Sequence, residues 1–340
     1  MQVGIVGFSG SGKSTLFELL TSARPDPARA HSGQVGVAVL SDRRLDDLAA
    51  LHNPKKITPA TVEFLDTPGL LKGAQAENAQ RLALIREGDA LLIVLNGFSP
   101  GDAEAELRQF DDELLFADMM VLTNRAQRLE ASTKKPRPDR EQQLKELELV
   151  KRALTALEEG KTVASLELTA DEKKPMRSFG LLTDKPRVVL LNAPQGEARD
   201  VSLARLGPGS AAIDVKLELE LAALEPEERA AFMAEMEITD LGRDRVIRLA
   251  YDAVGMITFF TAGEPEVRGW NLERGSTAVE AAGKIHTDLA KGFVRAEVAA
   301  FDEIKAAGTL KEVKARKLQR LEGKEYIVKD GDVVYFRSAL

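Results

Sequence analysis

The sequence predicts an α/β fold built on a mostly parallel sheet. Three short apolar runs, Gln2–Val6, Ala90–Asn96 and Arg187–Asn192, are typical of strands that helices cover on both faces. Segments with the apolar spacing of helices separate these runs. Two long amphipathic segments interrupt the alternation between the second and the third run, and a β-rich region begins at Met256. We therefore expect an α/β protein with an inserted α-helical hairpin and a C-terminal module.

Composition bounds the class of protein. The chain has 340 residues, of which 44% are hydrophobic and 30% charged, enough for a core and about two or three domains. No apolar run reaches the about 18 residues of a membrane span, and a strand begins directly at the N-terminus, so neither membrane helix nor signal peptide is expected. The absence of cysteine excludes disulfides and thiolate metal sites and fits the cytoplasm. The net charge of −7 disfavours nucleic-acid binding by overall charge, and no DNA partner is expected.

The first predicted strand leads into a phosphate-binding loop. Gly7–Thr15 reads Gly-Phe-Ser-Gly-Ser-Gly-Lys-Ser-Thr and matches G-x-x-x-x-G-K-[ST], with a strand before it and a helix after it. Such a loop turns backbone N–H groups toward one anion, and the helix N-terminus adds partial positive charge. Lys13 is expected to reach the β- and γ-phosphates, and the Ser14 hydroxyl to bind magnesium. The other nucleotide-binding residues expected here are Ser9, Gly10, Ser11, Gly12 and Thr15.

A second motif, Asp66-Thr67-Pro68-Gly69-Leu70, follows the predicted strand Val62–Leu65. In phosphate-loop hydrolases an Asp at the end of a neighbouring strand holds Mg²⁺, often through water. The backbone N–H of Gly69 is expected to approach the γ-phosphate. D-x-x-G alone usually marks an ordinary turn, but its place after a strand and downstream of the loop favours nucleotide hydrolysis. The expected catalytic residues are Lys13, Asp66 and Gly69, and the expected metal ligands are Ser14 and Asp66.

The remaining patterns predict three parts. Helical spacing from Asp102 to Lys134 and from Glu141 to Glu159, around a Pro-containing turn, predicts an antiparallel hairpin. The sequence leaves open whether the hairpin is structural or an arm that binds a partner. Further strands are expected at 34–40 and 212–215, and helices at 77–87, 227–237 and 241–254. The expected domains are 1–101 with 181–255 for nucleotide binding, 102–180 for the hairpin, and 256–340 for the C-terminal module.

Over nearly its whole length the chain resembles the YchF family, Obg-related ATPases of the translation-factor (TRAFAC) class. The resemblance implies a phosphate-loop domain, an inserted hairpin and a C-terminal TGS domain, a small β-grasp module. It also implies a cytoplasmic, ribosome-associated protein that hydrolyses nucleotide slowly until a partner binds. The segments that carry it are Ser41–Asp46, Asn53–Lys56, Asp66–Leu70, Thr258–Gly263, Glu266–Trp270, Gly283–Asp288, Gly292–Val298 and Glu322–Tyr326.

Departures from this pattern put hydrolysis in question more than binding. Many related GTPases orient the attacking water with a Gln after the D-x-x-G glycine, whereas Leu70 cannot hydrogen-bond. An apolar residue here is shared with the family, which implies that phosphate positioning, Mg²⁺ and charge carry the reaction. Gly10 stands where the family usually has Asn, and Ala30 where a Thr completes Mg²⁺ coordination. The second switch is shortened after Lys72-Gly73-Ala74, so the chain resembles a divergent paralogue.

Base recognition is expected at Asn192-Ala193-Pro194-Gln195, where guanine readers carry N-K-x-D. The Lys and the Asp are missing, so guanine has no obvious acceptor. The resemblance implies a preference for ATP, with GTP retained. Asn192 and Gln195 are the expected base-side residues, and the alternative for Asn192 is the polar end of a buried strand.

Residues 305–329 carry eight basic and three acidic side chains, a local charge of +5. This segment could contact the ribosome through ribosomal RNA, or it could be a solvated helix face, and both stay open. The leading hypothesis is a slow Mg²⁺-dependent ATP hydrolase that acts as a conformational switch in translation. A nucleotide-dependent binding module with little or no hydrolysis and a GTP-specific GTPase are the alternatives. The hairpin and the C-terminal module argue against a nucleotide kinase.

Overall fold

The computed structural model describes residues 1–29, 31–98, 102–134, 138–194, 203–207, 209–238 and 241–339. Their contacts form two compact units, Met1–Gly36 with Phe64–Arg243, and Val37–Glu63 with Asp244–Leu340. The unit boundaries fall inside strands β2 (Gln34–Val39) and β4 (Thr61–Asp66) and inside helix α9 (Gly242–Ala253). The sequence predicts residues 37–63 and 244–255 in the nucleotide domain, whereas their contacts group them with the C-terminal residues. The division into three domains stays a prediction.

The first sheet has the strand order β2-β4-β1-β5-β6-β7. Strands β1 (Gln2–Val6), β5 (Ala90–Asn96), β6 (Arg187–Asn192) and β7 (Ala211–Ile213) pair side by side, and each of these pairs is parallel. The burial of β5 explains its continuous apolar sequence, because Ala90 to Leu95 are each at most 1% exposed. The mostly parallel sheet predicted from these runs is confirmed.

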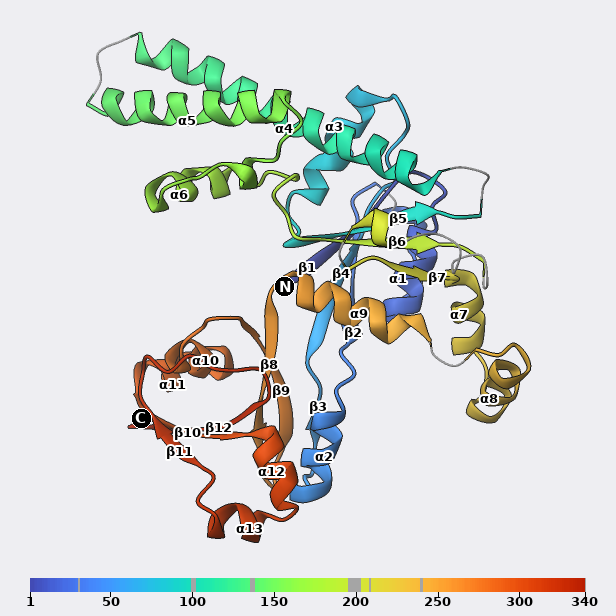
Figure 1. The fold of residues 1–340 in the computed structure, drawn as a ribbon, viewed down its shortest axis with the longest axis vertical. Coiled ribbons are helices and arrows are strands. Elements are labelled where there is room, and N and C mark those ends of the chain that lie inside the picture. The colour runs from blue at the N-terminus through green and yellow to red at the C-terminus, as the bar shows by residue number, and fades with distance from the viewer. Residues whose placement is uncertain are drawn as a thin grey trace. The chain divides into compact units, whose positions relative to one another are not determined.

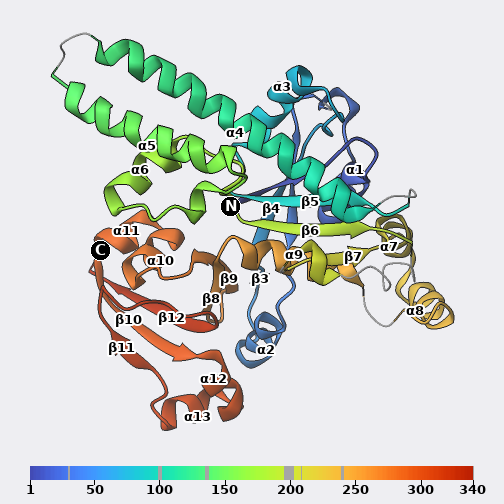
Figure 2. The same cartoon turned by 45° about the horizontal axis from the view of Figure 1, so that its top comes forward.

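Two long helices of the first unit form the expected hairpin. Helix α4 (Ala103–Thr133) and helix α5 (Arg140–Glu158) lie side by side in both views, with α6 (Ala170–Ser178) next to α5 (Figures 1 and 2). The first half of α4 packs through Phe110 against the sheet, and its second half packs against α5. One continuous helix therefore contributes to the apolar core of the sheet and to that of the hairpin. The other helices of this unit are α1 (Lys13–Thr21), α3 (Gln75–Ile85), α7 (Val215–Ala222), α8 (Pro226–Glu235) and the short 3₁₀ turns η1 (Pro27–Arg29), η2 (Val163–Ser165) and η4 (Leu203–Leu206).

The second unit has a mixed sheet of order β11-β10-β12-β8-β9-β3. Its central pairs β8·β9 and β10·β12 are antiparallel, while β8 and β12 pair in parallel. The alternation of β8 puts Phe259 into one apolar cluster and Phe260 into another, on opposite faces of the sheet. Its strands are β3 (Ile57–Thr58), β8 (Met256–Ala262), β9 (Val267–Glu273), β10 (Phe293–Ala300), β11 (Arg320–Glu322) and β12 (Asp332–Ser338).

Helices cover both faces of this second sheet. Helix α10 (Ala278–Ile285) packs Ala278, Ala281 and Ala282 around Phe259. Helix α2 (Arg43–His52) and helix α12 (Phe301–Ala307) pack around Phe260. A mixed sheet with a helix across it agrees with the expected β-rich C-terminal module. The remaining helices are α9 (Gly242–Ala253), α11 (Thr287–Lys291) and α13 (Leu310–Ala315), and none of the helices in the described part of the chain could cross a membrane.

Candidate functional site

The loop from Gly7 to Gly12 joins β1 to α1 and needs its glycines. The φ angles of Gly7, Gly10 and Gly12 are +145°, +84° and +95°, a region that side chains rarely adopt. A Cβ at Gly12 would also lie 2.2 Å from the Nδ2 of Asn192. Gly12 caps α1 without a side-chain hydrogen bond. The first N–H groups of α1 are therefore free to bind an anion.

The loop and the end of β4 line a cavity of about 340 Å³. Two predicted residues lie behind the loop instead of in its lining, namely Ser11 and Asn192. The Asn192 Nδ2 donates to the Ser11 carbonyl oxygen at 2.9 Å, and the Val215 N–H donates to the Asn192 Oδ1 at 3.2 Å. Asn192 thus braces the loop from the end of β6, while Gln195 lies outside the described residues. The predicted residues that line the cavity are Ser9, Gly10, Gly12, Lys13, Ser14, Thr15, Asp66 and Gly69.

Lys13 is a buried cation at the floor of this site. Its side chain is 6% exposed, and its Nζ donates to the Phe8 carbonyl oxygen at 2.7 Å. Burial lowers the pKa of Lys13 to about 8, although the negative charges of Asp66 and Glu106 oppose this shift. Lys13 therefore remains mostly protonated at neutral pH, and among the described residues its Nζ hydrogen-bonds only to the Phe8 carbonyl oxygen. A phosphate oxygen would be a stronger partner, because both members of that pair are charged.

Ser14 and Asp66 meet on one side of the cavity. The Ser14 Oγ donates to the Asp66 Oδ2 at 2.8 Å, and the Asp66 Oδ1 is buried without a hydrogen-bond partner among the described residues. Burial raises the pKa of Asp66, while hydrogen bonds and the charge of Lys13 lower it. An unsatisfied carboxylate oxygen beside a hydroxyl fits Mg²⁺, which takes oxygen ligands and keeps several waters or phosphates. No cluster of three acidic or histidine residues suited to a metal occurs in the described part of the chain.

The segment after Asp66 lies directly on the phosphate loop. The Leu70 N–H donates to the Gly7 carbonyl oxygen at 3.0 Å, and the Ser9 N–H donates to the Leu70 carbonyl oxygen at 2.9 Å. A Cβ at Gly69 would lie 2.7 Å from the Lys13 Nζ and 2.8 Å from the Ser9 backbone. The Leu70 side chain is 1% exposed and belongs to the apolar core of the sheet. Position 70 therefore offers no group to orient water in the cavity.

Three further residues line the cavity that the sequence analysis did not single out, Asp26, Arg29 and Gln34. The Asp26 N–H donates to the Gln34 Oε1 at 2.7 Å, and the Arg29 Nε lies 3.7 Å from the Asp26 Oδ2. Asp26 and Arg29 lie beside and in η1, and Gln34 is the first residue of β2, where no sequence motif marks them. Ala30, the expected departure from the family pattern, lies outside the described residues.

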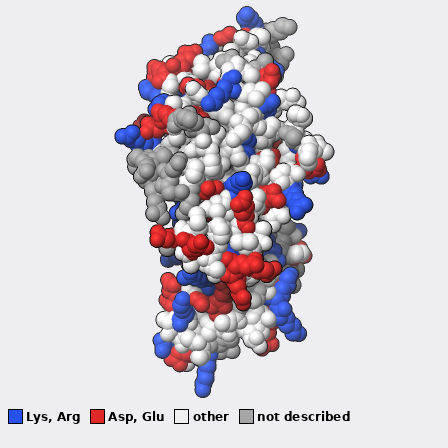
Figure 3. All heavy atoms as spheres, turned by 90° about the vertical axis from the view of Figure 1, so that its right-hand side faces the viewer, with Lys and Arg blue, Asp and Glu red and all other residues white. Residues whose placement is uncertain are grey.

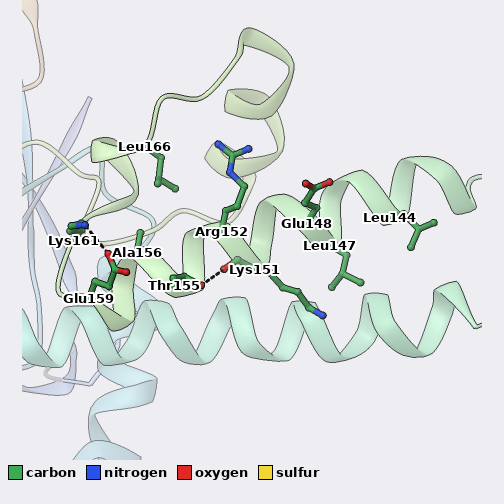
Figure 4. Close-up of a pocket in the computed structure, with 10 residues that line it drawn as sticks. All are labelled: Leu144, Leu147, Glu148, Lys151, Arg152, Thr155, Ala156, Glu159, Lys161 and Leu166. Carbon is green, nitrogen blue, oxygen red and sulfur yellow. Dashed lines mark hydrogen bonds and ion pairs between the residues drawn. The ribbon is translucent and has the colours of Figure 1, made fainter.

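A larger cavity of about 600 Å³ lies along α5 of the hairpin, and Figure 4 shows its lining residues. Its three cations each have a carboxylate partner: Lys151 pairs with Glu130, Arg152 with Glu172, and Lys161 with Glu159, at 2.6, 2.6 and 2.7 Å. Its other lining is largely aliphatic, including Leu144, Leu147 and Leu166. This cavity offers no unpaired charge to a phosphate, unlike the site around Lys13.

Comparisons with known proteins agree with this geometry. Residues 2–125 match the sequence model MMR_HSR1, described as a 50S ribosome-binding GTPase, and residues 256–339 match YchF-GTPase_C, described as a protein of unknown function. The chain is 36% identical to the Ribosome-binding ATPase YchF of Bacillus subtilis (strain 168), covering 99% of each chain. It is 35% identical to the protein of the same name in Escherichia coli O157:H7, covering 98% of each. The YchF GTPase of Schizosaccharomyces pombe has a similar structure, with a TM-score of 0.85 and 26% identity over 99% of this chain and 97% of that chain.

Proposed function

The chain belongs to the YchF family, and from this premise we propose that it is a phosphate-loop nucleoside triphosphatase that associates with the ribosome. The observation that carries the proposal is the convergence of Lys13, Ser14 and Asp66 on one cavity, with the Ser14 Oγ 2.8 Å from the Asp66 Oδ2. Residues of these types in this arrangement bind a triphosphate together with Mg²⁺. The proposed location is the cytoplasm, where ribosomes meet nucleotide.

We assign the roles within the site as follows. Lys13 exchanges its bond to the Phe8 carbonyl oxygen for oxygens of the β- and γ-phosphates. Ser14 and Asp66 would hold Mg²⁺ through the hydroxyl and carboxylate oxygens, and the bound ion would neutralise charge on the phosphates. The backbone N–H groups of Ser9 to Thr15 hold the rest of the phosphate chain, and Asn192 keeps the loop in shape from behind.

The same geometry supports a conformational switch. A Cβ placed on Gly69 would lie 2.7 Å from the Lys13 Nζ, so the Gly69 backbone borders this ammonium, and we propose that a γ-phosphate bound to Lys13 moves Gly69. Asn78 of α3 connects this movement to the hairpin. The Leu71 N–H donates to the Asn78 Oδ1 at 2.9 Å, and the Asn78 Nδ2 donates to the Leu71 carbonyl oxygen at 2.8 Å. The Asn78 Nδ2 also donates to the Glu113 Oε2 of α4 at 3.0 Å. The γ-phosphate therefore biases the position of α3 and α4.

We propose that the protein prefers ATP and also accepts GTP. The reason is that the Lys and the Asp of the guanine motif are absent after Asn192. Turnover is expected to be slow, since the buried Leu70 cannot orient water. That same burial favours the second candidate, a nucleotide-dependent binding module with little or no hydrolysis.

The proposed partner surface is the basic segment 305–329 of the C-terminal TGS-like unit. Carboxylates offset part of its charge, because Lys305 lies 2.9 Å from Asp47 and Arg316 lies 2.7 Å from Glu312. Figure 3 likewise shows acidic and basic side chains interspersed on the face that it draws. The exposed side chains Lys311, Lys317, Lys324 and Lys329 form no ion pair among the described residues and are the proposed contacts to ribosomal RNA phosphates.

Phosphate release measured with ATP and with GTP, each with and without ribosomes, separates the candidates. The proposal predicts slow release that is faster with ATP and that ribosomes stimulate. Nucleotide binding without release under all four conditions would favour the binding module. In parallel, loss of ribosome co-sedimentation after Lys317→Glu and Lys324→Glu, with unchanged ATP binding, would support the basic segment as the contact; undiminished co-sedimentation would exclude it.

A further inference from the structure

Arg81 of α3 reaches the phosphate loop from a helix that carries no nucleotide motif. Its Nη1 donates to the carbonyl oxygen of Gly69, and the Ser9 Oγ donates to the same oxygen at 3.3 Å. Gly69 in turn lies against the Lys13 Nζ, which a Cβ at Gly69 would approach to 2.7 Å. The guanidinium of Arg81 and the ammonium of Lys13 therefore flank the same glycine, where the γ-phosphate is expected.

The carboxylate that lines the same cavity as Arg81 is that of Glu77, one helical turn earlier, and it forms no ion pair with the Arg81 guanidinium. The Arg81 side chain is half-buried, and no carboxylate of the described residues lies within ion-pair distance of it. The positive charge of Arg81 contributes to lowering the pKa of Lys13. Asp66 and Glu106 act on Lys13 more strongly than Arg81 does, so this repulsion is the smaller effect, and a phosphate between the two cations would reduce it further. The arrangement is therefore suited to an added negative group.

Arg81 also has the donors and the space to bind a phosphate. A guanidinium carries five N–H donors, and the Gly69 carbonyl oxygen takes one of them. Arg81 and Pro68 line a cavity of about 330 Å³ next to the phosphate site, so the side chain has room to change its rotamer. Planar guanidinium groups bind phosphate oxygens in a bidentate manner that lysine cannot reproduce.

We propose that Arg81 is a catalytic arginine supplied within the chain, which binds the γ-phosphate and stabilises the charge that develops during hydrolysis. In this reaction a water oxygen bonds to the γ-phosphorus, the bond to the β-γ bridging oxygen breaks, and the diphosphate leaves with that electron pair. The proton lost by the water passes to phosphate or solvent, and Arg81 remains protonated throughout. The inference rests on the proposed hydrolase function. Arg81 would accelerate hydrolysis by stabilising charge, whereas the side chain of Leu70 cannot contribute by orienting water.

Arg81→Ala and Arg81→Lys test this role, with Gln80→Ala on the same helix as the matched control. We expect Arg81→Ala to slow phosphate release about 10³-fold, the lower range for such arginines, while the Kd for ATP changes only several-fold. Arg81→Lys keeps a charge and a donor for Gly69 but lacks the planar fork, so it should also lose most of the rate. Rates are measured in single turnovers, and thermal unfolding checks that each variant is folded.

A second readout is the affinity for ADP with aluminium fluoride, which imitates the transferring phosphoryl group. Wild type is expected to bind ADP with aluminium fluoride more tightly than ADP alone, and Arg81→Ala to lose that difference. An unchanged rate in Arg81→Ala, or full rescue by Arg81→Lys, would overturn the catalytic role while leaving the hydrolase function intact. If wild type releases no phosphate with or without ribosomes, the proposed function itself fails, and the role of Arg81 with it.

Discussion

ATP affinity is expected to fall as the pH rises above about 8, because Lys13 loses its proton in the free protein. Burial lowers the pKa of Lys13 to about 8 in the absence of ligand. A bound triphosphate places negative charge on the Nζ and raises this pKa, so that binding above pH 8 requires uptake of a proton. The affinity for ATP is therefore highest at pH values below the pKa of Lys13 in the free protein. It declines as the pH rises, until the pH reaches the pKa of Lys13 in the complex. At about pH 9 roughly nine-tenths of free Lys13 is neutral, which predicts about tenfold weaker binding than at about pH 7.

The assay is a titration with a fluorescent ATP analogue across this pH range at constant ionic strength and Mg²⁺ concentration. Lys13→Arg is the control, because its guanidinium stays protonated and its affinity, whatever its absolute value, should not vary with pH. Burial raises the pKa of Asp66, but Asp66 is present in both proteins, so a change caused by its titration would appear equally in wild type and in Lys13→Arg. A wild-type affinity that is constant over these two pH units would refute the reasoning, as would an equal decline in Lys13→Arg.

Three other perturbations follow from the geometry of the first unit. Ser14→Ala should abolish the strengthening of ATP binding by Mg²⁺, measured as the ratio of Kd values with and without a chelator; a ratio equal to that of wild type would remove Ser14 from the metal site. Asp118→Ala should lower the free energy of unfolding by about 3–5 kcal/mol in urea, because this fully buried carboxylate accepts hydrogen bonds from Arg86 at 2.7 Å and from the Leu182 and Thr183 N–H groups at 3.0 and 2.8 Å. A loss below about 1 kcal/mol would mean that water accepts the hydrogen bonds of these donors in place of the carboxylate. Asn192→Ala should weaken ATP and GTP binding alike, because the Ser11 carbonyl loses its brace; a change confined to one nucleotide would instead indicate base contact.

Much of the nucleotide site is predictable because its local signals are strong. The buried strands Gln2–Val6, Ala90–Asn96 and Arg187–Asn192 have the predicted bounds, since parallel strands covered on both faces are continuously apolar. The contact between Ser14 and Asp66, 52 residues apart, follows from two motifs at the ends of neighbouring strands. The hairpin is also confirmed, because its two amphipathic helices are long and a Pro-containing turn separates them.

The rest depends on packing that no local pattern records. Arg81 reaches Gly69 because of the rotational phase of α3, which the nearby burial of Asn78 and Leu82 determines. The helix at Ala170–Ser178 is absent from the predicted elements, because a proline inside a segment, here Pro175, argues against a helix. Thr169 and Glu172 form a capping box that stabilises its N-terminus. Residues 37–63 contact the C-terminal part of the chain, and Ile57 pairs with Val267 of β9. Strand propensity predicts that a segment is a strand, but it does not predict which strand it pairs with.

The most direct test of the account is phosphate release from Mg²⁺–ATP by wild type and by Asp66→Asn, with ATP binding measured separately for each. Asp66→Asn keeps the shape of the side chain and its contact with Ser14 but removes the charge that holds the metal. The account predicts slow release by wild type that ribosomes accelerate, and a loss of most of that rate in the variant while ATP still binds. Equal rates in the two proteins, or no release by wild type with or without ribosomes, would contradict a magnesium-dependent hydrolase at this loop.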